Sequence, residues 1–197
     1  MGVVTPPDTG HKGGKSFIDW RETVMFKAFR AARTLHLDKI LLHVFVSTHP
    51  FTDYFKGLEK INAVRQIFRE QTQAVLRDLQ VDFTWIGGYM GVNNSNGHLI
   101  VNTHYLNNGD NIDIYLDLIH ELVHVKQFSE GKDLFDRKYS YVERPTEVEA
   151  YQYAVDEAKR MGLSDERICN YLKTEWMNEE AFTQLTRTLN INCSTQH

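Results

Sequence analysis

The sequence predicts an α+β fold in which a small mixed sheet is followed by a run of helices. Two observations support this interpretation. Short β-rich segments occur only before residue 104, where they alternate with helix-patterned segments. Beyond Gly131, the apolar residues instead recur at helical spacing as far as the C-terminal region. With 197 residues, the chain is long enough for one domain with a buried core.

Each predicted element depends on a local pattern of residues. Apolar positions at helical spacing predict helices at 17–37, 58–79, 112–128, 146–161, 164–171 and 178–189. Runs rich in β-branched and aromatic residues predict strands at 40–46, 81–89 and 98–103. The last two strands are expected to be joined by the Gly- and Asn-rich turn at 91–97. Asp110 or Asn111 is the expected N-cap of the helix at 112–128, and Ser164 opens a later helix.

Composition narrows the class of protein. Residues 1–15 are rich in Pro, Gly and Thr and are expected to form a flexible tail before a single domain at 16–197. A formal net charge of −4 and the lack of a basic block argue against a dedicated nucleic-acid binder. No apolar run reaches the 18 residues or so that a transmembrane helix needs, so no membrane association is expected. The chain shows no secretory signal and has only Cys169 and Cys193, which predicts reduced thiols and a cytoplasmic location.

His120, Glu121 and His124 form an H-E-x-x-H motif inside the predicted helix 112–128. Residues four apart lie on one face of a helix, so the two imidazoles can converge on one point. That arrangement suits Zn²⁺, which at catalytic sites also takes a third protein ligand and a water. Glu121 is then placed to take a proton from that water. The alternative is an ordinary amphipathic helix whose histidines face solvent.

The third ligand is expected to be a carboxylate, because no histidine follows the motif until His197. This absence disfavours the H-E-x-x-H-x-x-G-x-x-H enzymes, which need a later histidine. Five acidic residues are the candidates: Glu143, Glu147, Glu149, Asp156 and Glu157.

The segment 146–154 resembles the glutamate helix of gluzincin metallopeptidases, in which a Glu followed by a small residue completes an H-E-x-x-H site. By this match Glu149, which precedes Ala150, is the third ligand. The small size of the chain suggests the compact minigluzincins, and the resemblance covers roughly residues 96–160. It implies a zincin-like fold: a small mixed sheet with a backing helix and the H-E-x-x-H helix in an upper part, 16–124, followed by a helical lower part, 125–197. It also implies that 97–103 is an edge strand, able to pair with an extended peptide. The alternative is an interior strand without substrate contact.

Glu149 has a second interpretation. Thr146-x-x-Glu149 is also a capping box, in which the Glu side chain bonds back to the helix start, and Pro145 is another helix-start signal. Ala150 and Ala154 favour ligation, because small residues allow close packing against a second helix. If Glu149 only caps the helix, Glu147 and Glu143 are the next candidates.

The resemblance implies a zinc-dependent metallopeptidase that cleaves a peptide or protein substrate with Glu121 as general base. A donor that stabilises the transition state is expected among Tyr139, Tyr141, Arg144, Tyr151 and Tyr153. The alternative is a catalytically silent zinc-binding regulatory or interaction protein with the same ligands, and a third is a helical interaction domain without metal. By analogy with latent minigluzincins, Cys193 or His197 could cover the metal, although a frayed terminus is the favoured interpretation. The oligomeric state is left open.

Overall fold

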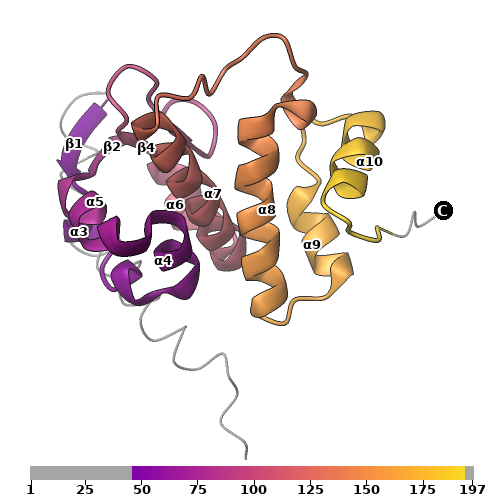
Figure 1. The fold of residues 1–197 in the computed structure, drawn as a ribbon, viewed down its shortest axis with the longest axis horizontal. Coiled ribbons are helices and arrows are strands. Elements are labelled where there is room, and N and C mark those ends of the chain that lie inside the picture. Colours follow the sequence, from indigo (N-terminus) through magenta and orange to yellow (C-terminus); the bar gives the residue numbers. More distant parts are fainter. Residues whose placement is uncertain (1–45, 194–197) are drawn as a thin grey trace, which may run out of the picture.

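A computed structural model describes residues 46–193, apart from the side chain of Val46. The expected tail at 1–15, the expected helix at 17–37 and all but the last residue of the expected strand at 40–46 lie outside the described residues. The strands are β1 (Val46–Pro50), β2 (Gln80–Thr84), β3 (Met90–Val92) and β4 (Leu99–Asn102). The α-helices are α3 (Phe51–Tyr54), α4 (Asn62–Phe68), α5 (Thr72–Asp78), α6 (Thr103–Asn108), α7 (Asn111–Ser129), α8 (Pro145–Arg160), α9 (Asp165–Leu172) and α10 (Glu179–Thr188) (Figure 1). The short 3₁₀ turns are η1 (Leu58–Lys60), η2 (Arg69–Gln71) and η3 (Tyr141–Glu143).

The four strands form one mixed sheet in the order β1-β2-β4-β3. β1 is antiparallel to β2, β2 is parallel to β4, and β3 is antiparallel to β4. On one face, Val81 pairs with Leu99 and Phe83 with Val101, and all four side chains are buried. The prediction of an α+β fold with a small mixed sheet is therefore confirmed.

The strand nearest α7 is β3. β4 lies inside the sheet, between β2 and β3, so the interpretation of 97–103 as an interior strand is correct and its interpretation as an edge strand is wrong. The predicted strand at 81–89 ends at Thr84, and the antiparallel partner of β4 is the separate strand β3. Because β3 is only three residues long, it carried too little of an alternating pattern to be recognised in the sequence.

The predicted helix at 58–79 is divided into α4 and α5. Arg69 has a φ of 53°, in the left-handed region, which interrupts the right-handed helix after Phe68. Thr72 starts the second piece, and its hydroxyl donates to the carbonyl of Arg69 at 2.6 Å. The segment contains no Gly or Pro that would have signalled the break.

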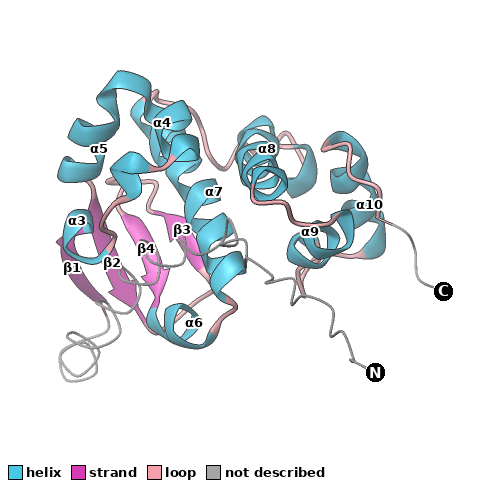
Figure 2. Cartoon of the chain, turned by 90° about the horizontal axis from the view of Figure 1, so that it is seen from below, coloured by secondary structure: helices cyan, strands magenta, loops and turns pink. Residues whose placement is uncertain are grey.

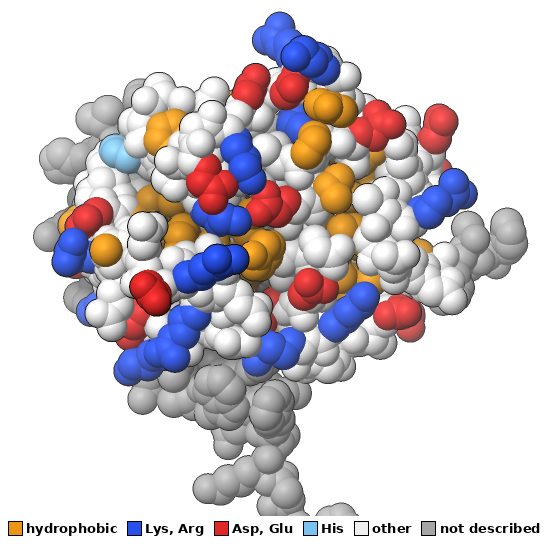
Figure 3. All heavy atoms as spheres, viewed as in Figure 1, with side chains coloured by type: hydrophobic (Ala, Val, Ile, Leu, Met, Phe, Trp, Pro, Cys, Tyr) orange, Lys and Arg blue, Asp and Glu red, His pale blue; other side chains and the backbone are white. Residues whose placement is uncertain are grey.

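α7 lies between the sheet and α8 in both ribbon views, and α9 and α10 lie beyond α8 (Figures 1 and 2). Asp110 caps α7 by accepting from the backbone N–H groups of Ile112 and Asp113, and Ser164 caps α9, as the sequence predicts. On the face drawn in Figure 3, acidic and basic side chains are interspersed. No helix in the described range 46–193 has the length and apolar character needed to span a membrane.

Cys169 and Cys193 form a disulfide, with their Cα atoms 5.7 Å apart. It joins α9 to the segment that follows α10. The expectation of two reduced thiols is therefore wrong for this structure, and so is a role for Cys193 as a metal cap. His197, the other candidate cap, lies outside the described residues.

Candidate metal centre

The two motif histidines come from the middle of α7. His120 and His124 are 5% and 6% exposed, and their Nε2 atoms are 3.0 Å apart. The helix is anchored through the apolar residues around the motif, since Leu118, Ile119 and Leu122 are fully buried. Because those side chains fix the rotation of α7, the histidine face turns toward α8 rather than to solvent. This excludes the interpretation in which the histidines lie on a solvent-exposed surface.

The third member of the cluster is Glu147, from the first turn of α8. Its Oε2 atom lies 3.4 Å from the Nε2 atoms of both His120 and His124. These three atoms therefore form a triangle with sides of 3.0, 3.4 and 3.4 Å. Ligands bound tetrahedrally at 2.0–2.1 Å from Zn²⁺ are about 3.3–3.4 Å from one another. The three side chains are thus spaced like one face of a zinc coordination tetrahedron.

A hydrogen bond to the side-chain oxygen of Gln127 fixes the tautomer of His124. The Nδ1 atom of His124 lies 2.7 Å from the Oε1 atom of Gln127. The amide nitrogen of Gln127 donates to the carbonyl of Thr146 at 2.9 Å and to the carboxylate of Glu149 at 3.0 Å. Because both partners of that nitrogen only accept, the amide oxygen must face His124, and His124 Nδ1 must carry the proton. In the neutral ring, the Nε2 atom then has the lone pair that binds a metal ion, as the coordinating tautomer requires.

Glu149, predicted as the third ligand, is not part of this cluster. Its carboxylate accepts from Lys126 at 2.9 Å and from Lys132 and Gln127 at 3.0 Å each. The structure therefore replaces Glu149 with Glu147, which the sequence left as an alternative. The capping box is not formed either, because α8 has Arg144 at its N-cap with no side-chain cap and Pro145 in its first turn. Glu149 is instead connected to the cluster through Gln127, which bonds to both Glu149 and His124.

The remaining acidic candidates lie elsewhere. Glu143 bonds to Ser140 and Gln184 at the surface, and Asp156 is exposed and accepts from Gln152. Glu157 is buried, but it accepts from Tyr115 on α7 at 2.6 Å and pairs with Arg160.

Burial and mutual charge shape the protonation of the site. Burial raises the pKa of Glu121 to about 8, with further upward contributions from Glu147 and Asp117 and an opposing one from His124. Burial opposes the charged form of Glu147 too, but the two imidazoles beside it hold its pKa below the usual range. Burial lowers the pKa of His120. Burial also lowers the pKa of His124, but the interactions of His124 with Glu147, Glu121 and Gln127 are stronger and raise its pKa to about 9. A metal ion must therefore displace a proton from His124, which makes binding pH-dependent.

Two tyrosines and an arginine approach the cluster from the lower part of the molecule. The ring of Tyr151 contacts that of His120 with centroids 4.4 Å apart, and its hydroxyl lies 3.2 Å from that of Tyr141. Arg144 reaches Glu147 at 3.5 Å. The other two expected donors are elsewhere: Tyr139 is 45% exposed, and Lys126 lies over the ring of Tyr153.

Sequence reasoning missed Gln127 altogether. Its position, three residues after His124 on the same helical face, was a usable signal, but glutamine is also common on solvated helices. What distinguishes this residue is its complete burial, which is visible only in the structure.

Comparison of the chain with protein-family models, with curated proteins and with solved structures found no match. The centre is consequently defined by its own geometry: a buried His-His-Glu group able to hold a metal ion.

Proposed function

We propose that this protein is a zinc metallopeptidase of gluzincin type, with His120, His124 and Glu147 as the zinc ligands. The observation that supports this proposal is the triangle of ligand atoms, together with the tautomer that Gln127 imposes on His124. A His₂Glu donor set is one that catalytic zinc sites of metalloproteases use. Zinc, when bound there, lowers the pKa of a water toward 7 and polarises the scissile carbonyl.

The surrounding side chains supply the proton transfers. Glu121 lies next to His120 on α7, and its Oε2 atom has no hydrogen-bond partner within residues 46–193. In its ionised form, this carboxylate takes the proton of the attacking water and passes it to the leaving amine. The hydroxyls of Tyr141 and Tyr151, on the His120 side of the cluster, are the donors available to a developing oxyanion.

The substrate is placed along β3, the edge strand next to α7. An extended peptide can add to such an edge through main-chain hydrogen bonds. This replaces the role that the sequence assigned to 97–103, since β4 already has neighbours on both sides.

Glu121→Gln tests the proposal. The amide keeps the size of the carboxylate but cannot accept a proton, so the variant should bind one zinc ion per chain and lose at least about 100-fold in hydrolysis of a peptide library. Glu166→Gln, an exposed change on α9, is the matched control and should cleave at the parent rate. Equal cleavage by Glu121→Gln and the parent, or no zinc in the parent, would refute the proposal.

A catalytically silent zinc protein is the second candidate. The observation that favours it is burial: His120, His124, Glu147 and Glu121 are all between 5% and 9% exposed, so a substrate has to displace covering groups. If the parent protein binds zinc and cleaves no peptide or denatured protein, this candidate replaces the enzyme.

A further inference from the structure

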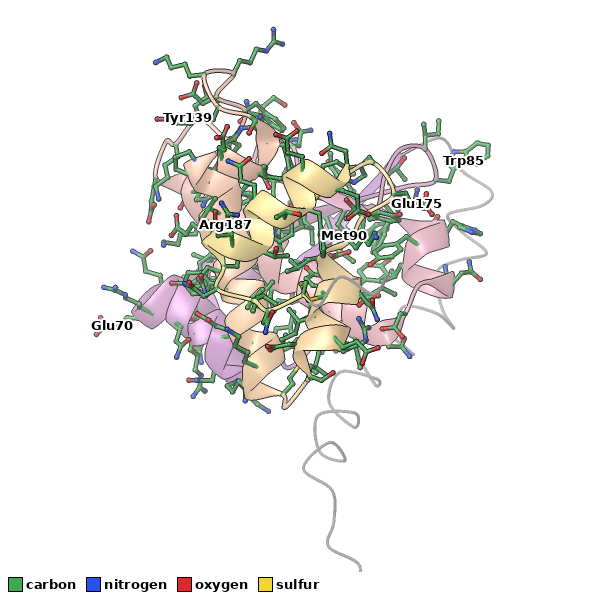
Figure 4. All side chains as sticks on the ribbon, turned by 90° about the vertical axis from the view of Figure 1, so that its right-hand side faces the viewer. Glu70, Trp85, Met90, Tyr139, Glu175 and Arg187 are labelled. Atoms are coloured by element: carbon green, nitrogen blue, oxygen red, sulfur yellow. A yellow bond between two sulfur atoms is a disulfide. The ribbon has the colours of Figure 1, made fainter. Side chains whose placement is uncertain are left out.

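A cavity of about 630 Å³ lies on the β3 side of the molecule, and neither the motif nor the metal ligands account for it. Its walls come from the loop before β3, from α6 and from the segment between α9 and α10. The residues that give it chemical character are Gly87, Tyr89, Tyr105, Glu175 and Trp176. We call it the aromatic pocket. Figure 4 labels Glu175, at its rim, and Met90, the first residue of β3.

The aromatic pocket is connected to the metal centre through one of its walls. The Tyr105 hydroxyl donates to Asp117 at 2.5 Å, and Asp117 lies about one turn before His120 on α7. This contact places the α6 wall of the pocket against the same helix face that carries the metal ligands.

The opposite wall reaches the centre as well. Trp176 packs edge-on against Tyr141 with ring centroids 4.6 Å apart, and Tyr141 meets Tyr151, whose ring contacts His120. A substrate residue in the aromatic pocket would therefore sit beside the centre, on the side of the edge strand β3.

The walls combine aromatic faces with one unpaired carboxylate. Tyr89 and Tyr105 pack with centroids 4.7 Å apart, and Trp176 is 55% exposed. Glu175 is exposed and forms no ion pair with any residue in the range 46–193. A cation over aromatic rings, next to a free carboxylate, gains both a cation–π contact and an ion pair.

The side chains behind the aromatic pocket carry negative charge, as Glu175 does. Asp117 and Asp113 lie on the α7 face behind Tyr105. Burial is the largest cause of the raised pKa of Tyr105, and the negative charges of these two residues raise it further. Arg167 is the cation nearby, and Asp110 and Asp113 already bind it at 2.7 and 2.6 Å. The residues that line the pocket include one carboxylate, Glu175, and one histidine, His104, but no Lys or Arg.

Backbone geometry keeps the entrance open. Asn102 holds the loop with two hydrogen bonds: its side-chain amide donates to the carbonyl of Gly87 at 3.0 Å, and its backbone N–H donates to the carbonyl of Tyr89 at 3.0 Å. A Cβ added at Gly87 or Gly88 would meet nothing within 4 Å, so this wall presents bare backbone to an incoming side chain.

We propose that the aromatic pocket is a specificity site that takes the Lys or Arg side chain of a substrate peptide. This inference rests on the proposed peptidase function for its biological meaning, but binding alone can test it. The charged end of the side chain pairs with Glu175 while its stem and charge lie against Trp176 and the paired tyrosines.

The test compares two capped peptides, acetyl-Ala-Ala-Arg-Ala-Ala-amide and the same peptide with citrulline, the neutral isostere of arginine. Binding is measured by titration calorimetry on zinc-loaded Glu121→Gln, so that no cleavage occurs. Arginine should be preferred about tenfold, which corresponds to one ion pair plus one cation–π contact. The preference should weaken with added salt.

Glu175→Gln, added to that background, should reduce the preference to about threefold without changing zinc affinity, while the control Glu166→Gln leaves the preference intact. Gly88→Val, which narrows the entrance, should weaken binding of both peptides. Equal binding of the two peptides, or binding of neither, would refute the proposal that the aromatic pocket takes a basic side chain. If arginine is preferred in binding but the parent cleaves nothing, the peptidase proposal fails and the binding site stands.

Discussion

The position of a single carboxylate in the metal centre depends on where α8 begins. Glu147 and Glu149 are two residues apart, which turns their side chains about 200° from each other around a helix. Only one of them can therefore face the two histidines of α7. Because Pro145 is the first residue of α8, Glu147 faces the histidines and Glu149 faces Lys126 and Lys132.

This assignment predicts different effects for two matched substitutions. Glu147→Gln removes a ligand and should weaken zinc binding by more than about 100-fold, whereas Glu149→Gln acts only through Gln127 and should cost about tenfold, as outer-shell changes do. Competition with a chelator of known affinity measures both. Similar losses in the two variants, or a greater loss for Glu149→Gln, would show that the ligand is misassigned.

Asp117 should give the metal-free protein a measurable pH dependence. Burial raises its pKa in the folded chain from the ordinary value of 3.8 to about 6, against the hydrogen bond from Tyr105. Between those values the folded state binds more protons than the unfolded state, so the stability that Asp117 contributes falls as pH rises. At about 1.4 kcal/mol per pH unit, the change across this window is about 3 kcal/mol.

The measurement is urea unfolding of the parent and of Asp117→Asn from pH 4 to 7. The parent should lose stability relative to the variant as pH increases, because the amide does not titrate. A constant difference between the two proteins would mean that Asp117 ionises in the folded state as it does in water.

At the scale of secondary-structure elements, the sequence predicted the long helices α7 and α8 well but missed the short helices α3 and α6 and the short strand β3. The bounds expected for α7 and α8, 112–128 and 146–161, are within one residue of the structure, because long amphipathic segments repeat their pattern several times. The three-residue strand β3 contains less than two periods of alternation. The break between α4 and α5 depends on the conformation of Arg69, which residue type does not signal.

For the same reason, the motif half of the site could be predicted and the carboxylate half could not. His120, Glu121 and His124 lie within one helix, so their spacing alone sets their geometry. The partner on α8 depends on how the two helices pack and rotate against each other, which side-chain contacts decide.

The small-residue ridge of α8 is a prediction that the packing allows us to test. Ala150, Ala154 and Ala158 are fully buried. Ala154→Leu adds volume to this filled layer and should destabilise the fold by about 1–3 kcal/mol. Lys159→Leu, at an exposed position of α8, is the control and should change stability by less than about 0.5 kcal/mol. Chemical unfolding of the two variants measures the difference, and similar stabilities would exclude tight packing of this ridge.

At the scale of the whole molecule, the metal centre joins two structural layers. α7 packs on the sheet and carries the two histidines of the cluster, whereas α8 belongs to the group of helices on its other side and carries Glu147 (Figure 2). Because folding must bring these layers together to form the site, metal binding should stabilise their association.

The disulfide between Cys169 and Cys193 fixes the outer edge of that second layer. It closes a loop of 24 residues that contains α10, and cross-links of this kind stabilise a fold chiefly by restricting the unfolded chain. Reduction, or the change Cys193→Ser, should therefore lower the free energy of unfolding by about 3 kcal/mol. Urea unfolding with and without reductant measures this, and thiol labelling of the unfolded protein should find no free cysteine in the untreated parent. Reductant should leave the Cys193→Ser variant unchanged, since it has no cross-link to lose. If the untreated parent instead yields two free thiols and the same unfolding midpoint in both conditions, the reduced state expected from the sequence is correct after all, and α10 is held by its apolar contacts alone.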